Sequence, residues 1–166
     1  MSCHQGTQKQ FYDDPRVMYV SIHRYEQGFW WPNLQESNYD HIGTGPGAGY
    51  NVNIPLNVTG NGDTEYLHAW HQVVLPVAYE YQPHLVLISA GYDPAIGCPE
   101  GEQRVSPACF AHFTHSLMAL AKGSLHFLYV NLKTLNLRKS LCCPGRRLLS
   151  SILGRGSSSH PENSAW

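Results

Sequence analysis

The sequence predicts an α/β domain built around a parallel sheet. The strongest sign is the apolar run at 85–90, which small residues close and which has the length of a buried strand covered on both faces. A second sign is alternation: a strand-like stretch at 17–23 and a helical stretch at 64–81 precede this run, and another helical stretch follows from 106. The length of 166 residues fits one domain with a real hydrophobic core.

The first third of the chain predicts two strands joined by a long connection. Residues 4–8 show no periodic pattern and are expected to form a loop. Residues 17–23 alternate and are β-branched, and residues 52–56 form a short extended piece. The connection at 26–50 is irregular, but its aromatic content argues against disorder, so we expect an ordered functional loop.

Two helices are expected in the rest of the domain. Asp63 is placed to cap a helix over 64–81, in which Pro76 should cause a kink. Ser106 and Pro107 are typical of a second helix start. The apolar face of that second helix is formed by Phe110, Phe113, Leu117 and Leu120.

Charge divides the chain near Gly123. Residues 1–122 hold 5 Lys and Arg against 11 Asp and Glu, whereas residues 123–166 hold 6 against 1. We therefore expect a basic tail at 124–166, poorly ordered beyond a possible strand at 125–130. No apolar run approaches the ~20 residues of a membrane span, so we expect no membrane association. We also expect no signal peptide and no direct nucleic-acid contact.

The cysteines and histidines give no strong metal signature. The five cysteines are odd in number and lack CxxC spacing, which favours reduced thiols in an intracellular compartment. Cys98 is expected to pack as a small apolar group. His112 and His115 could share a metal from one helix, but a surface pair and a core-edge histidine are expected there instead, and His68 and His71 are expected on a helix surface.

Asp93 is the first candidate for a functional residue. It follows the apolar run directly, in Gly91-Tyr92-Asp93, and so lies just past the carboxyl end of a predicted strand. Open α/β sheets bind their ligands at that edge. Many aspartates in such places instead cap helices or solubilise loops, so the position alone leaves both interpretations open.

A set of motifs in a fixed order makes the interpretation more specific. The motifs are Gly6-Thr7-Gln8, Ser21 to Gly28, Trp31-Pro32, the glycine-rich 43–49 with Tyr50 to Pro55, Leu75 to Ala78, Pro83 to Leu87, Ser89 to Asp93 and Pro99-Glu100-Gly101. Through these motifs, residues 5–122 resemble the zinc-dependent histone deacetylases of class IIb. The resemblance implies that residues 1–123 form a partial arginase/deacetylase-like three-layer domain with a parallel β-sheet. It also implies zinc-dependent hydrolysis of acetyl-lysine amides, with tubulin and histones as acetylated substrates, in the cytoplasm and also in the nucleus.

Carried over position by position, the resemblance assigns five residues. Asp93 matches a zinc-ligand aspartate, and Trp31 matches an aromatic residue that flanks the acyl-lysine channel. Ser21 and Ile22 match a structural monovalent-cation (K⁺) site. Glu100 matches a residue at the mouth of the channel, where a carboxylate would favour an acetylated polyamine. Two purely structural alternatives remain open: Trp31 could pack against its own loop, and Glu100 could be an exposed turn residue.

Departures from the family pattern lead us to expect a catalytically incomplete chain. Aligned on Gly6-Thr7-Gln8, Ser2 and Cys3 stand at histidine positions, and His4 is one place out of register. After Gly123 the family's Glu-Gly-Gly-Tyr loop is not found, and Tyr129 lies inside an apolar run. No catalytic histidine pair or tyrosine is therefore assigned, and zinc binding by the chain is doubtful. The alternative is a non-catalytic binding or interfering module.

Overall fold

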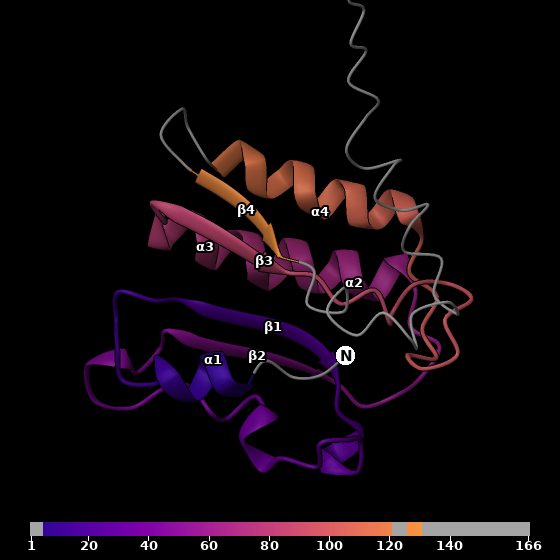
Figure 1. Ribbon diagram of the computed structural model, residues 1–166, viewed down its shortest axis with the longest axis horizontal. Coiled ribbons are helices and arrows are strands. Elements are labelled where there is room, and N and C mark those ends of the chain that lie inside the picture. The colour runs from indigo at the N-terminus through magenta and orange to yellow at the C-terminus, as the bar shows by residue number, and fades with distance from the viewer. Residues whose placement is uncertain (1–4, 121–125, 131–166) are drawn as a thin grey trace, which may run out of the picture.

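The computed structural model describes residues 5–120 and the backbone of residues 126–130 (Figure 1). The predictions for Ser2, Cys3, His4, the Tyr129 side chain and the tail beyond 130 lie outside the described residues. Within the described part, no helix has the length and apolar character needed to cross a bilayer.

Four strands form two parallel pairs, as the prediction of a parallel α/β domain requires. They are β1 (Tyr19–Arg24), β2 (Asn51–Leu56), β3 (Leu85–Ser89) and β4 (His126–Val130). Strand β1 pairs with β2 from Tyr19 opposite Asn51, and β3 pairs with β4 from Leu85 opposite His126. All four expected strands are therefore present, with bounds within two residues of the predicted ones.

The helices follow the expected order with one addition and one interruption. They are α1 (Gln5–Gln10), α2 (Asp63–Ala69), the π-helix η4 (Trp70–Val74), α3 (Leu75–Tyr81) and α4 (Pro107–Leu120). The loop expected at 4–8 is wrong, because residues 5–10 are helical. The connection at 26–50 contains only short 3₁₀ turns: η1 (Glu26–Gly28), η2 (Gln35–Ser37) and η3 (Gly45–Gly47).

The start of α2 and the surroundings of Pro76 differ from the prediction. Gly62, rather than Asp63, occupies the N-cap, and its N–H donates to Glu65 Oε2 over 2.8 Å. Pro76 lies in the first turn of α3, a position that tolerates its missing N–H. The interruption precedes it, as the π turn at 70–74, which amphipathic spacing alone does not reveal.

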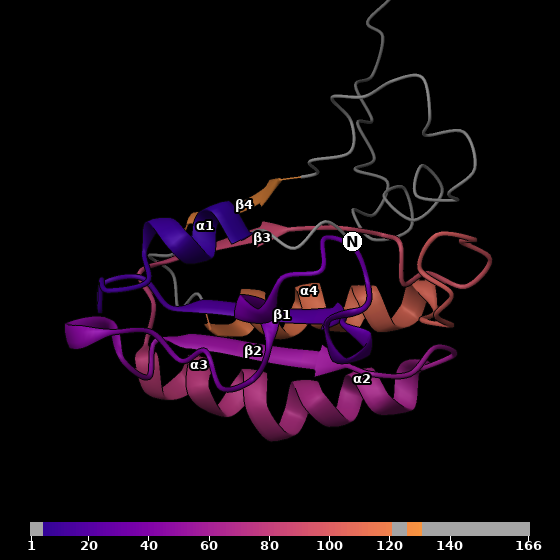
Figure 2. The same cartoon turned by 90° about the horizontal axis from the view of Figure 1, so that it is seen from below.

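The main core lies between the strands and the long helices. Trp70, Val74 and Leu117 are buried there against inward side chains from three strands. These strand residues are Val20, Ile22, Ile54, Val86 and Ile88. Figure 2 shows the strands with α1 on one side and α2 and α3 on the other, and α4 belongs to the same core through Leu117.

The other face of β1 and β2 is covered by the irregular connection, which polar side chains hold in place. Asn53 Nδ2 donates to the carbonyls of Glu36 and Asn38, each over 3.2 Å, and Asn51 Nδ2 donates to the carbonyl of His41. Gln8, which is 2% exposed, donates to the Glu36 carbonyl over 2.7 Å. The connection at 26–50 is thus ordered without regular structure of its own, as predicted.

Strand β3 is not covered on both faces within the described part of the chain, so that prediction is wrong. Its residues alternate between exposed and half-buried. Leu85 and Leu87 are 49% and 59% exposed, whereas Val86 and Ile88 pack into the core. A continuous apolar run can therefore form a strand that is covered on one face only. The run contains no polar residues at alternate positions, so the sequence does not distinguish such a strand from one that is covered on both faces.

Candidate functional site

Asp93 is buried at the carboxyl end of β3, as the sequence predicts. Strand β3 ends at Ser89, and Asp93 is 2% exposed four residues later. Gly101 approaches its backbone so closely that a Cβ at residue 101 would overlap the Asp93 carbonyl oxygen. The placement of the Asp93 backbone after β3 therefore requires a glycine at position 101, eight residues further along the chain.

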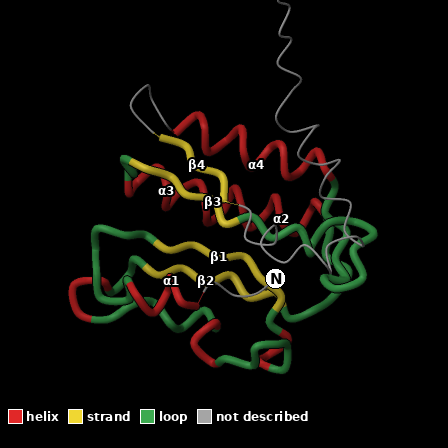
Figure 3. The backbone as a smooth tube through the Cα atoms, viewed as in Figure 1, coloured by secondary structure: helices red, strands yellow, loops and turns green. Residues whose placement is uncertain are grey.

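The segment after β3 is a compact loop closed by its own backbone. Val105 donates its N–H to the Pro94 carbonyl and accepts from the Ile96 N–H, both over 3.0 Å. Val105 is fully buried and packs with Tyr66 and Cys109. Figure 3 shows this loop beside the start of α2. Asp93 thus lies in a rigid setting rather than on a free surface turn.

Arg24 joins the end of β1 to this loop. Its guanidinium is buried, forms an ion pair with Glu26, and donates from Nη1 to Glu102 Oε1 over 3.1 Å and to the Gly101 carbonyl over 3.4 Å. The guanidinium carbon also lies 3.5 Å from the centre of the Trp30 ring. Such a stacked, forked contact is a use of arginine that lysine cannot reproduce.

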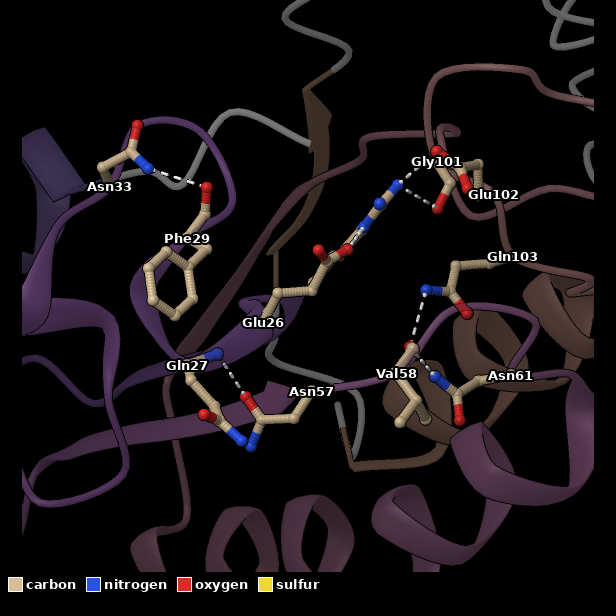
Figure 4. A network of polar contacts seen from close by, with 11 residues as sticks. Glu26, Gln27, Phe29, Asn33, Asn57, Val58, Asn61, Gly101, Glu102 and Gln103 are labelled. Carbon is tan, nitrogen blue, oxygen red and sulfur yellow. Dashed lines mark hydrogen bonds and ion pairs between the residues drawn. The ribbon is translucent and has the colours of Figure 1, made fainter.

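The loops after β1, β2 and β3 are tied together at this end of the strands. The Gln27 N–H donates to Asn57 Oδ1 over 2.8 Å. Asn61 and Gln103 both donate to the Val58 carbonyl, as the dashed lines in Figure 4 mark. A hollow of about 540 Å³ lies beside this network. It is lined by Arg24, Glu26, Gln27, Phe29, Asn57, Val58, Thr59 and Glu102.

Trp31 and Glu100 lie outside that hollow. Trp31 is 63% exposed and precedes a cis peptide bond to Pro32, while its neighbour Trp30 stacks on Arg24. Glu100 is exposed in the turn before Gly101. Trp30, and not Trp31, is therefore the tryptophan that packs against Arg24. The exposed side chains of Trp31 and Glu100 are both accessible to a large molecule.

Ser21 and Ile22 lie in the middle of β1, on opposite faces of the strand. Ile22 packs into the core, and Ser21 Oγ lies 2.9 Å from His23 Nδ1. The Nε2 of His23 donates to the Ser37 carbonyl over 2.8 Å, so Nδ1 accepts the Ser21 hydroxyl proton. The hydroxyl therefore acts as the donor in this contact. Burial lowers the pKa of His23, which keeps the ring neutral.

The described residues do not by themselves form a zinc site. A catalytic zinc ion takes three protein ligands, most often His, Cys, Asp or Glu. Over residues 5–120, no three such side chains gather closely enough to hold a metal ion. Asp93 thus occupies a predicted ligand position without two companions among the described side chains.

Two sets of contacts between residues far apart in the sequence are not predicted from the sequence. Arg24 contacts Gly101 and Glu102, which lie 77 and 78 positions further along the chain, so only the tertiary fold brings these residues together. His71 and His112 were expected on helix surfaces, which is correct, but they face each other from two different helices. Helical spacing finds pairs on one helix and cannot find a pair across two.

Comparison with known proteins gives a consistent result. A family model described as histone deacetylase domain matches residues 3–131. The chain is 53% identical over 121 residues to the polyamine deacetylase HDAC10 of Danio rerio, covering 73% of this chain and 18% of that protein. It is 49% identical over 120 residues to histone deacetylase 6 of Caenorhabditis elegans, covering 72% of this chain and 13% of that protein.

Solved structures extend the likeness to the fold. The histone deacetylase Clr3 matches with a TM-score of 0.73 and 47% identity, over 76% of this chain and 21% of that one. The HDA15 HD domain matches with a TM-score of 0.76 and 34% identity, over 95% of this chain and 44% of that one. The arginase/deacetylase-like α/β fold predicted from the sequence is therefore confirmed, and the chain spans less than half of each of these relatives.

Proposed function

The chain belongs to the histone deacetylase family, and from this premise we propose that it forms part of a zinc-dependent domain that hydrolyses acetyl-lysine amides. The observation that carries the proposal is Asp93. Its carboxylate is buried at the carboxyl end of a parallel strand, at the position that matches the family's zinc-ligand aspartate. Zinc held by three protein ligands would activate water and polarise the amide carbonyl.

For the chain by itself we propose no catalytic turnover. Asp93 is the one matched ligand among the described residues, and a single carboxylate binds zinc weakly. What the described residues do supply is support: a rigid loop around Asp93 and exposed side chains at Trp31 and Glu100. The second candidate function, a non-catalytic binding module, is favoured by this incomplete ligand set.

The substrate proposal has two branches. Relatives are named as histone deacetylases and as polyamine deacetylases, so the family name alone does not choose. We propose acetyl-lysine of proteins, histones and tubulin included, as the main substrate class, with acetylated polyamine as the alternative. Glu100 supports the alternative, since an exposed carboxylate attracts a polycation. We further propose a cytoplasmic and nuclear location, and a K⁺ site at Ser21 and Ile22.

A chimaera tests the domain proposal. Residues 5–120 would replace the matching segment of the zebrafish polyamine deacetylase, to which the chain is 53% identical. We expect the chimaera to melt cooperatively, to retain about one zinc per molecule and to hydrolyse acetylated substrate. Asp93→Asn in the chimaera should lose both zinc and turnover. A folded chimaera that holds no zinc would contradict the proposal.

Two further measurements separate the remaining alternatives. For the purified 166-residue chain, we expect no zinc whose binding depends on Asp93 and no turnover of acetyl-lysine peptide. One zinc per chain, lost in Asp93→Asn and accompanied by turnover, would overturn the incomplete-site proposal.

In the chimaera, Glu100→Leu should lower the preference for acetylated polyamine over acetyl-lysine peptide. An unchanged preference would remove the role of Glu100.

A further inference from the structure

His71 and His112 form a close pair across two helices. Their Nε2 atoms lie 3.1 Å apart, and their ring centres lie 5.1 Å apart with the planes inclined at 52°. Both side chains are exposed. His71 belongs to the π-helix η4 and His112 to α4, 41 residues further along the chain. The pair is therefore a product of helix packing.

The packing beneath the pair fixes its position. Trp70 and Phe113, the chain neighbours of the two histidines, stack with ring centres 4.3 Å apart. The Trp70 indole N–H donates to Ser116 Oγ over 3.3 Å, and that hydroxyl donates to the His112 carbonyl. The two helical segments are thus held together through Trp70, the residue that precedes His71. Little side-chain ordering remains to oppose a ligand that bridges the rings.

The π turn contributes to this arrangement. A π turn widens one turn of the helix and so changes the direction in which the following side chains point. Such turns are rare and are often found at functional sites. His71 is the second residue of the turn at 70–74. The π turn therefore lies in the segment that carries His71, one of the two histidines of the pair.

The spacing of the two nitrogens suits a shared metal ion. Zinc–nitrogen bonds of about 2.0–2.1 Å place two imidazole nitrogens of one tetrahedral site roughly 3.3 Å apart. In the metal-free pair, one Nε2–H donates to the other Nε2. With a metal bound, both Nε2 atoms become ligands and each ring carries its proton on Nδ1. The exchange moves one proton within a ring and leaves both rings neutral.

We propose that His71 and His112 form a bidentate surface site for a divalent transition-metal ion of the Zn²⁺, Ni²⁺ and Cu²⁺ class. Neutral imidazole is a preferred ligand of these ions. Within residues 5–120 no third His, Cys, Asp or Glu completes the cluster, so water fills the remaining positions. The bound ion links the π segment to α4. It thereby stabilises the packed arrangement of these helices by mass action.

Nickel-dependent thermal unfolding of the full 166-residue chain tests the site. The variants are His71→Ala and His112→Ala. The matched controls are His68→Ala and His115→Ala, which replace exposed histidines three residues away, in α2 and in α4. We expect NiCl₂ to raise the Tm of the unmodified chain and of both controls, and MgCl₂ to leave it unchanged. The nickel-induced rise should be lost in His71→Ala and in His112→Ala.

The Tm shift is the decisive measurement because other histidines and cysteines of the chain can bind nickel without joining these helices. No nickel-induced shift in the unmodified chain, a shift retained in either Ala variant, or a shift lost in a control would each overturn the site. Far-ultraviolet circular dichroism confirms that the Ala variants fold, and His71→Gln and His112→Gln replace any that does not. Isothermal titration with NiCl₂ should then show one binding event fewer in a variant that carries both His71→Ala and His112→Ala than in the unmodified chain.

Discussion

Gly101 is the residue on which the geometry around Asp93 depends most directly. Its α-carbon leaves no room for a side chain, because a Cβ would overlap the Asp93 carbonyl oxygen and lie 3.0 Å from the Pro94 nitrogen. Both obstacles are backbone atoms, which cannot move aside as a flexible side chain can. The sequence Pro99-Glu100-Gly101 by itself indicates only a turn.

We expect Gly101→Ala to lower the free energy of unfolding by about 3 kcal/mol, the upper end of the usual cost of overpacking. Gly6→Ala is the control, since no atom lies within 4 Å of its added Cβ and it belongs to a helix. Urea denaturation of both variants measures the difference. Equal midpoints for Gly101→Ala and the unmodified chain would show that the loop can open to accept the methyl group.

Cys109 is expected to be chemically inert in the folded chain. Burial raises the pKa of its thiol to about 12, and the nearby Asp63 carboxylate adds to the effect. Thiolate is the species that alkylating agents attack, so very little of it is present at pH 8. In iodoacetamide labelling followed by peptide mass analysis, Cys109 should stay unmodified in buffer and react in 8 M urea. Rapid native labelling would mean that the helix end opens often.

At the scale of elements, the starts of α2 and α4 are joined by one carboxylate. Asp63 accepts from the Ser106 N–H and from the Ser106 hydroxyl, each over 2.6 Å. The same hydroxyl oxygen accepts the Cys109 N–H over 3.2 Å and so caps α4. The sequence predicts a capping role for Asp63 and a helix start at Ser106. It does not predict that the two belong to one contact, because they are 43 residues apart.

Asp63→Ala should therefore cost more than the loss of an exposed helix residue. Hydrogen bonds to a charged group contribute roughly 1.5–3 kcal/mol, and we expect a loss of about 2 kcal/mol in the free energy of unfolding. Thr64→Ala, at the next and exposed position of α2, is the control and should change little. Chemical denaturation compares the two. If Thr64→Ala lowered the free energy of unfolding and Asp63→Ala did not, the link between the two helix starts through Asp63 and Ser106 would be wrong.

The long helical stretch shows where sequence periodicity reaches its limit. The predicted range of 64–81 is nearly the observed one, but the π turn at 70–74 lies inside it. A periodic pattern averages over several turns, so one widened turn leaves little trace in it. Packing decides the matter: Trp70 and Val74 are both buried against Leu117 of α4. The same packing places His71 opposite His112, which no local pattern indicates.

For the whole molecule, the fold class and strand positions could be predicted from sequence, because apolar runs and turn residues are local signals. The motif resemblance added the family and the candidate residues Asp93, Trp31, Ser21, Ile22 and Glu100. The contacts of the buried Arg24 with Gly101 and Glu102 could not be predicted, since they depend on two segments remote in the sequence meeting in space. The helix at 5–10 was missed because its sequence carries no apolar periodicity.

The open face of β3 has a consequence for how the chain behaves in solution. Leu85 and Leu87 present adjacent apolar side chains on one face of the strand, while Val86 and Ile88 serve the core. A strand that is apolar on its outer side lowers colloidal solubility, since concentrated molecules can bury these leucines against each other. Because strand side chains alternate, polarity at positions 85 and 87 can be altered independently of the packed positions. We therefore expect polar substitutions at positions 85 and 87 to raise solubility with little effect on the packing of Val86 and Ile88 in this five-residue strand.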